Sequence, residues 1–451
     1  MKKITLQISQ FYEKITITHI ILVSIILHVF VIAQPQNLQI WDESIFLEIV
    51  RSFLNGEDHT PYQLPGLNFF VGSAISIFGD YWFSWRIPSI IFGMLSLLVF
   101  YKILCHVTSE RNALLATSIL SFDTIFFVHS TLFLRDMPLI FFGMLSIFLY
   151  LKKRYYLSAL PLGFAFLIKE TAIFFLIFIT IYHIAITKPW QGKIKHIKTM
   201  IIFVGIIVST FLLPLWIYDT IYKPIVYDPV IPTYETVEGK NVPISYPRIK
   251  VMESRNYTTQ EPIGFITNPI EHLGIFFSEG YITSDAYNVK NWDTRHTNYP
   301  WNWILPLPPP DDANGLGWVK EKIIDDTKEG IFHKGKIVGI EWRGDPNLSL
   351  WVIGFWGSLA FILYSVIKKR YKTTLFLSSG IVSMYLPYLF LSLTGRVMFP
   401  YYFLLTVPFV ALGIVLLLDL IGNNKIRIIS KTILLSGVIA WFVWFYPLKI
   451  I

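Results

Sequence analysis

The chain has 451 residues, of which 54% are hydrophobic, 17% aromatic and 15% charged, and apolar runs recur along most of its length. This composition excludes an ordinary soluble domain and indicates a polytopic membrane protein. The net charge of +8 at pH 7 does not indicate a nucleic-acid partner, because the Lys and Arg residues concentrate in short links between apolar runs, where they determine membrane orientation.

The apolar runs predict an all-α polytopic membrane protein with about eleven transmembrane helices. The first run, near 16–34, has a basic leader, but Gln34-Pro35-Gln36 follows it and offers no small-residue cleavage site, so we expect a retained span. Further spans are predicted near 87–106, 112–130, 136–151, 157–168, 171–187, 199–218, 348–367, 373–393, 398–419 and 430–448.

Every short link on one side of these spans is basic, for example Lys152-Lys153-Arg154. The positive-inside rule therefore predicts a cytoplasmic N-terminus in a multi-pass protein of the cell membrane. The run 157–168 gives about 18 Å of helix and cannot cross a hydrocarbon core of about 30 Å alone. Residues 157–187 are therefore either two spans or a re-entrant pair, with Lys169-Glu170 at a protein-lined depth.

Two regions between the spans differ in composition. Residues 41–86 begin polar and continue apolar and aromatic, which predicts one or two helices in the outer interface plane, or a short extra span that would invert every later link. Residues 219–347 are polar and long enough for a small folded insertion. The predicted divisions are an N-terminal membrane region 1–218 with a candidate catalytic loop 35–86, a large extracytoplasmic loop 219–347, and a C-terminal membrane region 348–451.

Charged residues gather at the outer ends of the predicted spans. A charge at a helix end usually extends to water, which accounts for any one of them taken singly. Their convergence on one leaflet is harder to explain in this way, and it indicates a site where cations and carboxylates act together. The residues are Asp42, Glu43, Arg135, Asp136, Lys169, Glu170 and Arg396.

This charge set suits the attack of a hydroxyl on the anomeric carbon of a sugar phosphate that a polyprenyl chain holds in the membrane. Asp42 is the candidate general base for the hydroxyl proton. Arg135, Lys169 and Arg396 are candidates to stabilise the negative charge that grows on the departing lipid phosphate. One carboxylate base with phosphate departure predicts direct displacement and inversion at the sugar carbon.

The order of these residues resembles that in the protein O-mannosyltransferases, or dolichyl-phosphate-mannose-protein mannosyltransferases, and their prokaryotic, archaeal-type relatives. The resemblance covers nearly the whole chain. It rests on Trp41-Asp42-Glu43, Pro61-Tyr62-Gln63-Leu64-Pro65-Gly66-Leu67, Arg86-Ile87-Pro88, Arg135-Asp136, Leu167-Ile168-Lys169-Glu170-Thr171-Ala172, Tyr299-Pro300-Trp301-Asn302-Trp303, and Gly395-Arg396 with Phe399-Pro400-Tyr401-Tyr402-Phe403.

The resemblance implies the membrane-embedded C-type glycosyltransferase fold with an outward-facing active site. It implies a polyprenyl (dolichyl) phosphate sugar donor, membrane lipid around it, and by default transfer of mannose to Ser or Thr of a protein. The family's His-Pro-Pro-Leu element is replaced here by Gln63-Leu64-Pro65-Gly66-Leu67, so a substrate-contacting His is absent at this point. The implied roles are base for Asp42, acceptor contact for Glu43, phosphate contact for Arg135, Lys169 and Arg396, and support for Asp136, Glu170 and Gln63.

Aromatic and His residues give weaker candidates. His296 and Trp303 in the large loop are candidate acceptor contacts, because aromatic faces stack on sugars, although Trp residues also anchor loops at membrane interfaces. Tyr401 is a candidate phosphate contact, and an interfacial aromatic belt explains it as well. The acidic residues beside His59 include no His pair at ligand spacing, so no cofactor is required, and a divalent metal and a dimeric state both stay open.

Two other classes of protein fit the same composition. A transporter or flippase of lipid-linked sugars would line its path with membrane charges, but related halves and broken midplane helices are not evident in the sequence. An inert scaffold of the same fold would bind lipid-linked sugar without transferring it, and the acidic pair Asp42-Glu43 argues against this. The hypothesis we carry forward is an inverting glycosyltransferase that uses a polyprenyl-phosphate sugar.

Overall fold

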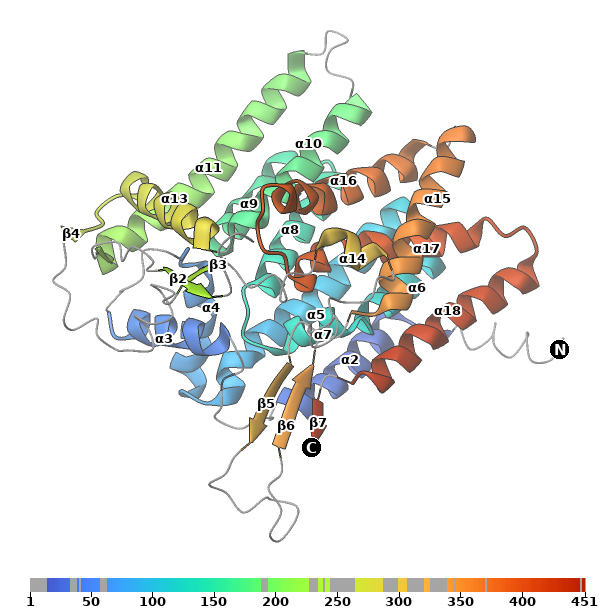
Figure 1. The fold of residues 1–451 in the computed structure, drawn as a ribbon. Helices are drawn as coiled ribbons and strands as arrows, with labels where there is room; N and C mark the ends of the chain where they lie inside the picture. The colour runs from blue at the N-terminus through green and yellow to red at the C-terminus, as the bar shows by residue number, and fades with distance from the viewer. Residues whose placement is uncertain are drawn as a thin grey trace, which may run out of the picture.

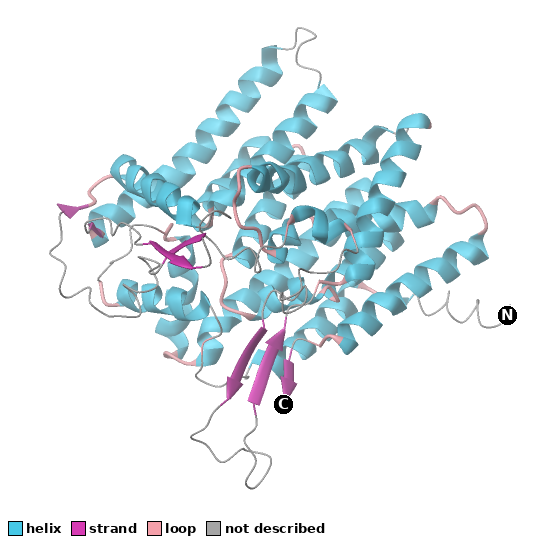
Figure 2. Cartoon of the chain, in the orientation of Figure 1, coloured by secondary structure: helices cyan, strands magenta, loops and turns pink. Residues whose placement is uncertain are grey.

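The computed structural model describes most of the chain, and helices dominate it (Figures 1 and 2). The candidate residue His296 and the segment around His59 lie outside the described residues. The described residues are 14–32, 39, 42–56, 63–187, 194–226, 234–237, 240–243, 264–286, 299–305, 320–324, 339–343, 346–369, 371–446 and 448–450.

The helices fall into two series, separated in sequence by the large loop. The first series is α2 (Ile17–Ile32), α3 (Asp42–Leu54), α4 (Gly66–Phe78), α5 (Trp82–Val107), α6 (Glu110–Ser121), α7 (Thr124–Thr131), α8 (Asp136–Leu151), α9 (Tyr155–Ile168), η1 (Glu170–Ala172), α10 (Ile173–Thr187) and α11 (Ile194–Tyr222). Within the loop lie α13 (Pro269–Ala286) and α14 (Pro300–Ile304), and after it come η5 (Ser349–Ile353), α15 (Gly354–Ile367), α16 (Tyr371–Leu393), η6 (Pro400–Leu405), α17 (Val407–Asp419) and α18 (Asn424–Trp444).

Each of the eleven predicted spans corresponds to an apolar helical segment, and the expected fold class is confirmed. Among the described residues, six helical segments are long and apolar enough to cross a membrane. A seventh is the pair α6 and α7, which is bent by 68° at its break. The other four, α2, α8, α9 and α17, are shorter apolar helices. Eleven complete crossings therefore stay a prediction.

The region predicted to lie in the interface plane forms α3 and α4. Each has 13 residues, which corresponds to about 20 Å of helix and is shorter than a hydrocarbon core of about 30 Å. α3 is amphipathic and buries Phe46, Leu47 and Val50, while its other face carries charged residues. Both features fit helices that lie along the bilayer surface, as predicted for residues 41–86.

Strands add a small part that the all-α expectation did not include (Figure 2). β1 (Ile225–Val226) pairs with β4 (Gly264–Phe265), and β2 (Tyr234–Val237) pairs with β3 (Lys240–Pro243), both antiparallel. β5 (Lys320–Ile324), β6 (Gly339–Arg343) and β7 (Leu448–Ile450) form a third antiparallel sheet, in that order. All except β7 lie in the predicted insertion. In Figure 1, β5, β6 and β7 project at the bottom of the view, whereas β2, β3 and β4 lie at its left.

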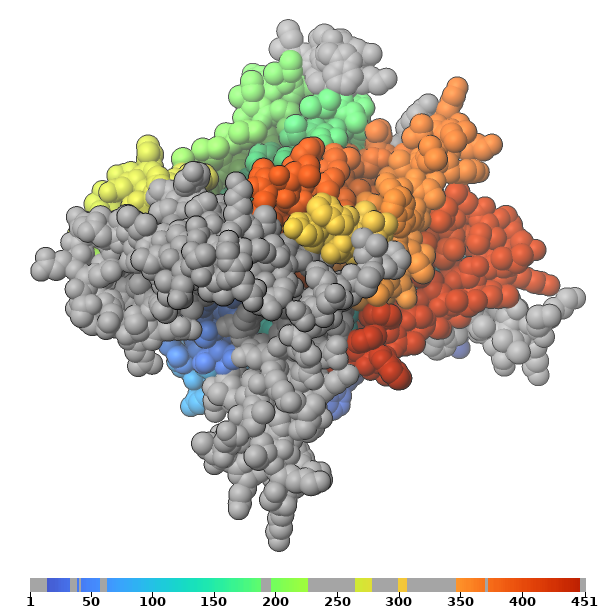
Figure 3. All heavy atoms as spheres, viewed as in Figure 1, coloured from blue at the N-terminus to red at the C-terminus, as the bar shows by residue number. Residues whose placement is uncertain are grey.

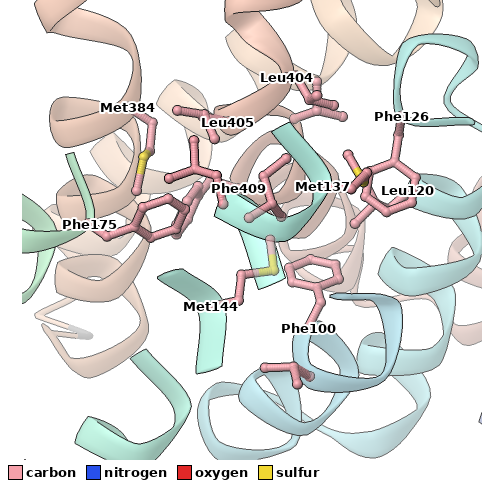
Figure 4. Packing of buried hydrophobic residues seen from close by; sticks show 14 of the residues in the cluster. Phe100, Leu120, Phe126, Met137, Met144, Phe175, Met384, Leu404, Leu405 and Phe409 are labelled. Carbon is pink, nitrogen blue, oxygen red and sulfur yellow. The ribbon is translucent and has the colours of Figure 1, made fainter. Parts of the chain in front are cut away.

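One apolar core joins the two helix series. Figure 4 shows Phe100, Met144 and Phe175 of the first series in the same cluster as Met384 and Phe409 of the second. Within the first series, Gly143 of α8 allows Phe175 of α10 to approach closely, because a Cβ added at Gly143 would lie 2.5 Å from the Phe175 ring. The first and last thirds of the chain are therefore parts of one folding unit.

The break between α6 and α7 has a specific polar contact. Asp123 caps α7 by accepting a hydrogen bond from the backbone N–H of Phe126 at 2.9 Å. Its second oxygen accepts a hydrogen bond from the indole Nε1 of Trp351 in η5, also at 2.9 Å. Both side chains are fully buried. A carboxylate at this depth is tolerable because donors surround it.

Candidate functional site

The two acidic residues that open α3 have different surroundings. Glu43 is fully buried and forms a bidentate ion pair with the fully buried Arg86 of α5, at 2.9 Å and 2.8 Å. The backbone N–H of Phe133, just before α8, donates to the same carboxylate at 2.9 Å. Arg86 also donates to the carbonyl of Ile32 at the end of α2. Glu43 therefore fastens α3 to three other segments and thereby places its neighbour Asp42.

Asp42 is partly exposed, in contrast to Glu43. Burial raises the pKa of the Asp42 carboxyl above its ordinary value, and the nearby charges of Arg135 and Lys169 oppose this rise without cancelling it. A carboxylate with a raised pKa binds a proton more strongly than an ordinary Asp, and this is the property required of a general base.

Asp136, the first residue of α8, connects two cationic or polar partners. Lys169, at the junction of α9 and η1, donates from Nζ to Oδ1 of Asp136 at 2.8 Å. His129, at the end of α7, donates from Nδ1 to Oδ2 at 3.0 Å. α7, α8 and α9 therefore meet at one end of the helices, which we call the site end.

Aromatic rings surround these charges. The ring of Tyr401, in η6, stacks on His129 at a centroid distance of 5.6 Å, and the ammonium of Lys169 lies 5.6 Å from the centre of the Tyr401 ring. The guanidinium of Arg135 lies 5.1 Å from the centre of the Phe46 ring. Such contacts orient a cation while leaving its hydrogen-bond donors available for an anion.

The structure thus brings together five of the residues predicted from sequence and one that was not predicted. Contacts or short-range electrostatic interactions connect Asp42, Arg135, Asp136, Lys169, Tyr401 and His129. They come from four parts of the chain, which the helix order brings to the site end.

Other predicted residues have a different placement. Trp303 is buried between Tyr388 and Phe403, and its side chain, like that of Glu43, has no access to an acceptor in this structure.

Glu170 is exposed beside Lys169, and Gln63 is partly exposed just before α4. Arg396 is partly exposed in the turn that leads to η6. Among the described residues, no three His, Cys, Asp or Glu side chains are grouped to hold a metal.

Two residues of this region were missed or undervalued in the sequence. His129 lies in an apolar run, and an ionisable residue at that position is itself a signal of function in a membrane protein. Arg86, named above only as part of the family resemblance, lies inside α5 and pairs with Glu43. No sequence pattern indicates that pair, because 43 positions separate its members.

This geometry can bind a phosphate and accept a proton. Arg135 and Lys169 supply cationic donors within reach of one carboxylate of raised pKa, and the rings of Tyr401 and Phe46 reduce the water around them. Electrostatic stabilisation is stronger in such a partly desolvated setting than in water. The arrangement suits a displacement in which a hydroxyl loses a proton as a phosphate departs.

The chain is similar to known proteins in part of its sequence and in its fold. Residues 58–218 match the family model described as dolichyl-phosphate-mannose-protein mannosyltransferase. The structure of the S. cerevisiae protein O-mannosyltransferase Pmt1-Pmt2 complex bound to the sugar donor aligns over 98% of this chain and 91% of its own, at 11% sequence identity and a TM-score of 0.63. The Archaeoglobus fulgidus oligosaccharyltransferase in the apo form aligns over 97% of this chain and 55% of its own, at 12% identity and a TM-score of 0.51. No curated protein matches the sequence.

Proposed function

We propose that this chain is a membrane glycosyltransferase of the dolichyl-phosphate-mannose-protein mannosyltransferase type, which transfers a sugar, by default mannose, from a polyprenyl phosphate to a hydroxyl. The family-model match over residues 58–218 and the shared fold support this proposal. The default acceptor is Ser or Thr of a protein. The observation that supports this most directly is a carboxyl of raised pKa, Asp42, beside the two cations Arg135 and Lys169.

Asp42 acts as the general base in this proposal. Its carboxylate removes the proton of the acceptor hydroxyl while the hydroxyl oxygen bonds to the anomeric carbon. The bond from that carbon to the phosphate oxygen breaks in the same step, and the electron pair leaves with the phosphate. Because attack and departure occur on opposite sides of the carbon, the configuration of the sugar inverts.

Arg135 and Lys169 bind the lipid phosphate and stabilise its additional negative charge. Asp136 positions Lys169 through the 2.8 Å ion pair, and His129 holds the other oxygen of Asp136. We include Arg396 and Tyr401 in the phosphate site, Arg396 by its cationic character and Tyr401 by its contact with Lys169. Gln63 and Glu170 stay candidates for residues that support the site.

Glu43 and Trp303 take positioning roles in place of the acceptor contacts first expected. The Glu43 carboxylate accepts from Arg86 and from the Phe133 backbone, so its oxygens are occupied. The Trp303 ring packs among aromatic side chains of α16 and η6. Loss of either would displace neighbours of the site, with no direct loss of an acceptor contact.

We assign the site end to the extracytoplasmic face. The links at the opposite end contain Lys152-Lys153-Arg154 and Lys368-Lys369, and basic links remain in the cytoplasm. The N-terminus precedes α2 on that cytoplasmic side. The acceptor and the sugar of the donor therefore meet outside the cytoplasm.

The test is transfer of radiolabelled mannose from dolichyl phosphate to a Ser/Thr-rich peptide by the purified protein in nanodiscs. Asp42→Asn should lower the rate by about 10²- to 10⁴-fold, the usual contribution of a general base. Asp419→Asn is the control, because Asp419 is also a helix-end carboxylate near a lysine but lies at the C-terminal end of α17, away from the site end.

Three results would separate the possibilities. Transfer that Asp42→Asn abolishes and Asp419→Asn leaves intact supports the enzyme and its base. Equal transfer by wild type and Asp42→Asn would refute the assignment of the base. Donor binding without transfer to peptide or to glycan acceptors would refute the proposed reaction, and movement of the intact donor between leaflets would then favour the flippase.

A further inference from the structure

The helix α13, in the large loop, has an apolar face that no described segment covers. The side chains of Ile270 and Phe277 are 79% and 66% exposed. They are seven residues apart, which places them on the same side of a helix about two turns from each other. His272, on the other side of α13, is fully buried.

α13 is attached to the end of α11 by three kinds of contact. His272 donates from Nδ1 to the buried carboxylate of Asp219 in α11 at 2.6 Å. β1, which follows α11, pairs with β4, which precedes α13. The backbone N–H of Ile266 also donates to the carbonyl of Pro224 at 2.9 Å. α13 is therefore held at a defined height on α11 and a defined rotation about its own axis.

The start of α13 is also defined. Asn268 caps the helix by accepting from the backbone N–H of Glu271 at 3.0 Å, and the Glu271 carboxylate accepts from the backbone N–H of Thr267 at 3.2 Å. This arrangement is similar to a capping box, except that Glu271 accepts from the residue before the N-cap, and it stabilises the first turn. Ile270 is thus exposed on a helix whose first turn is well formed.

The surface of α11 next to this contact is exposed and mainly apolar. α11 is one of the long apolar segments, and most of its exposed side chains are apolar. Trp216, one turn before Asp219, is 51% exposed, and exposed Trp residues are enriched where a membrane meets water. The exposed apolar residues of this half of α11 are Val208, Leu213, Trp216, Ile217 and Ile221. In Figure 3 the yellow surface of α13 adjoins the green surface of α11.

We infer that α13 is an interfacial helix whose Ile270–Phe277 face inserts into the outer leaflet beside α11. His272 contacts Asp219, one turn from Trp216, so α13 lies at the level of Trp216 and one bilayer can cover the exposed apolar side chains of both helices. Glu271 is the charged residue beside this face, so the attraction is apolar and does not require anionic lipid. The partner is the surface of a neutral phospholipid bilayer.

Depth-dependent fluorescence quenching tests this inference. Phe277→Cys is prepared with Cys105→Ser, labelled with nitrobenzoxadiazole, and reconstituted in phosphatidylcholine nanodiscs that contain a nitroxide near the headgroup or near the chain end. We expect a large loss of fluorescence with the shallow nitroxide and a smaller loss with the deep one. Thr394→Cys, at an exposed polar turn, is the control and should be quenched by aqueous iodide instead.

The other outcomes would overturn the inference. Quenching by iodide alone would place the face in water. Stronger quenching by the deep nitroxide would make α13 a membrane-crossing element. Protection from iodide and both nitroxides would mean that a protein, such as a second copy of this chain, covers the face. Ile270→Cys repeats the measurement, and a thermal unfolding midpoint equal to that of wild type checks that each labelled variant is folded.

Discussion

The protein holds an aspartate–lysine pair at each end of its helices. Asp136 accepts from Lys169 at 2.8 Å at the site end, and Asp419 accepts from Lys431 at 2.9 Å at the opposite end. The two pairs have almost the same length. Their surroundings differ, because the Asp136 side chain is 14% exposed and the Asp419 side chain is 42% exposed.

The neighbours of each pair explain what it can do. Asn112 joins the Asp419 pair as a donor to Asp419 and an acceptor from Lys431, and Nε of Arg427 lies 3.9 Å from the Asp419 carboxylate. The Asp136 pair has in its neighbourhood a further cation, Arg135, and a second carboxyl, Asp42, whose pKa is raised. Both pairs thus have a further cation nearby, and the added carboxyl of Asp42 is what distinguishes the candidate site.

The largest effect on stability should come from the buried pair that supports the site. Glu43→Gln leaves Arg86 buried without its counter-charge, and breaking a buried pair from one side costs about 3–5 kcal/mol of the free energy of unfolding. Thermal unfolding in detergent measures it. A replacement as stable as wild type would show that Glu43 does not hold α3 in place.

The transfer rate should distinguish the two lysines, Lys169 and Lys431. Lys169→Met should lower sugar transfer by about 10²- to 10³-fold, as expected for loss of a group that stabilises charge in the transition state. Lys431→Met, the same change at the opposite end, should leave the transfer rate close to that of wild type. Similar losses in both variants would mean that the two pairs act through stability alone.

The dependence on pH distinguishes Asp42 from Asp419. Because the pKa of Asp42 is raised by folding above 3.8, transfer should increase with pH along a limb whose midpoint lies above that value. The same carboxyl stabilises the folded state fully below pH 3.8, and this contribution is lost as pH rises through the folded pKa.

Asp42→Asn, which cannot ionise, should therefore unfold at a higher temperature than wild type at neutral pH while its activity is lost. Differential scanning fluorimetry across a pH series measures this. No such gain is expected for Asp419→Asn. A lower unfolding temperature for Asp42→Asn at neutral pH would contradict the raised pKa.

The smallest effect is expected at the exposed pair. Asp419→Asn should change the free energy of unfolding by about 0–1 kcal/mol, since exposed ion pairs contribute little and salt screens them. Unfolding at low and high salt measures this small contribution. A loss as large as that of Glu43→Gln would show that the opposite end is as desolvated as the site end.

The sequence predicts the helices of this fold well because apolar runs are local signals. The predicted segment 136–151 matches α8 at both ends, and 87–106 matches all but the first turn of α5. The sequence does not show how deeply each helix enters the bilayer, since four predicted spans are short apolar helices. A helix this short can lie within the bilayer only where neighbouring helices pack against it.

Fewer features of the candidate site than of the helices could be predicted from the sequence. Charge next to an apolar run indicated Asp42, Asp136 and Lys169, and the structure brings these side chains together. The partners of buried charges could not be predicted, because the contact of Glu43 with Arg86 depends on how α3 packs on α5. The burial of Trp303 likewise depends on helices of the second series.

The contact between Asp123 and Trp351 has a consequence for biosynthesis. Trp351 follows Asp123 by 228 positions, which corresponds to roughly 10–45 s of translation at the usual rates. During that interval the carboxylate at the break of α6 and α7 lacks its indole donor while its helices already enter the bilayer. We therefore expect the nascent N-terminal helices to remain loosely associated until η5 and α15 are synthesised and pack around Asp123.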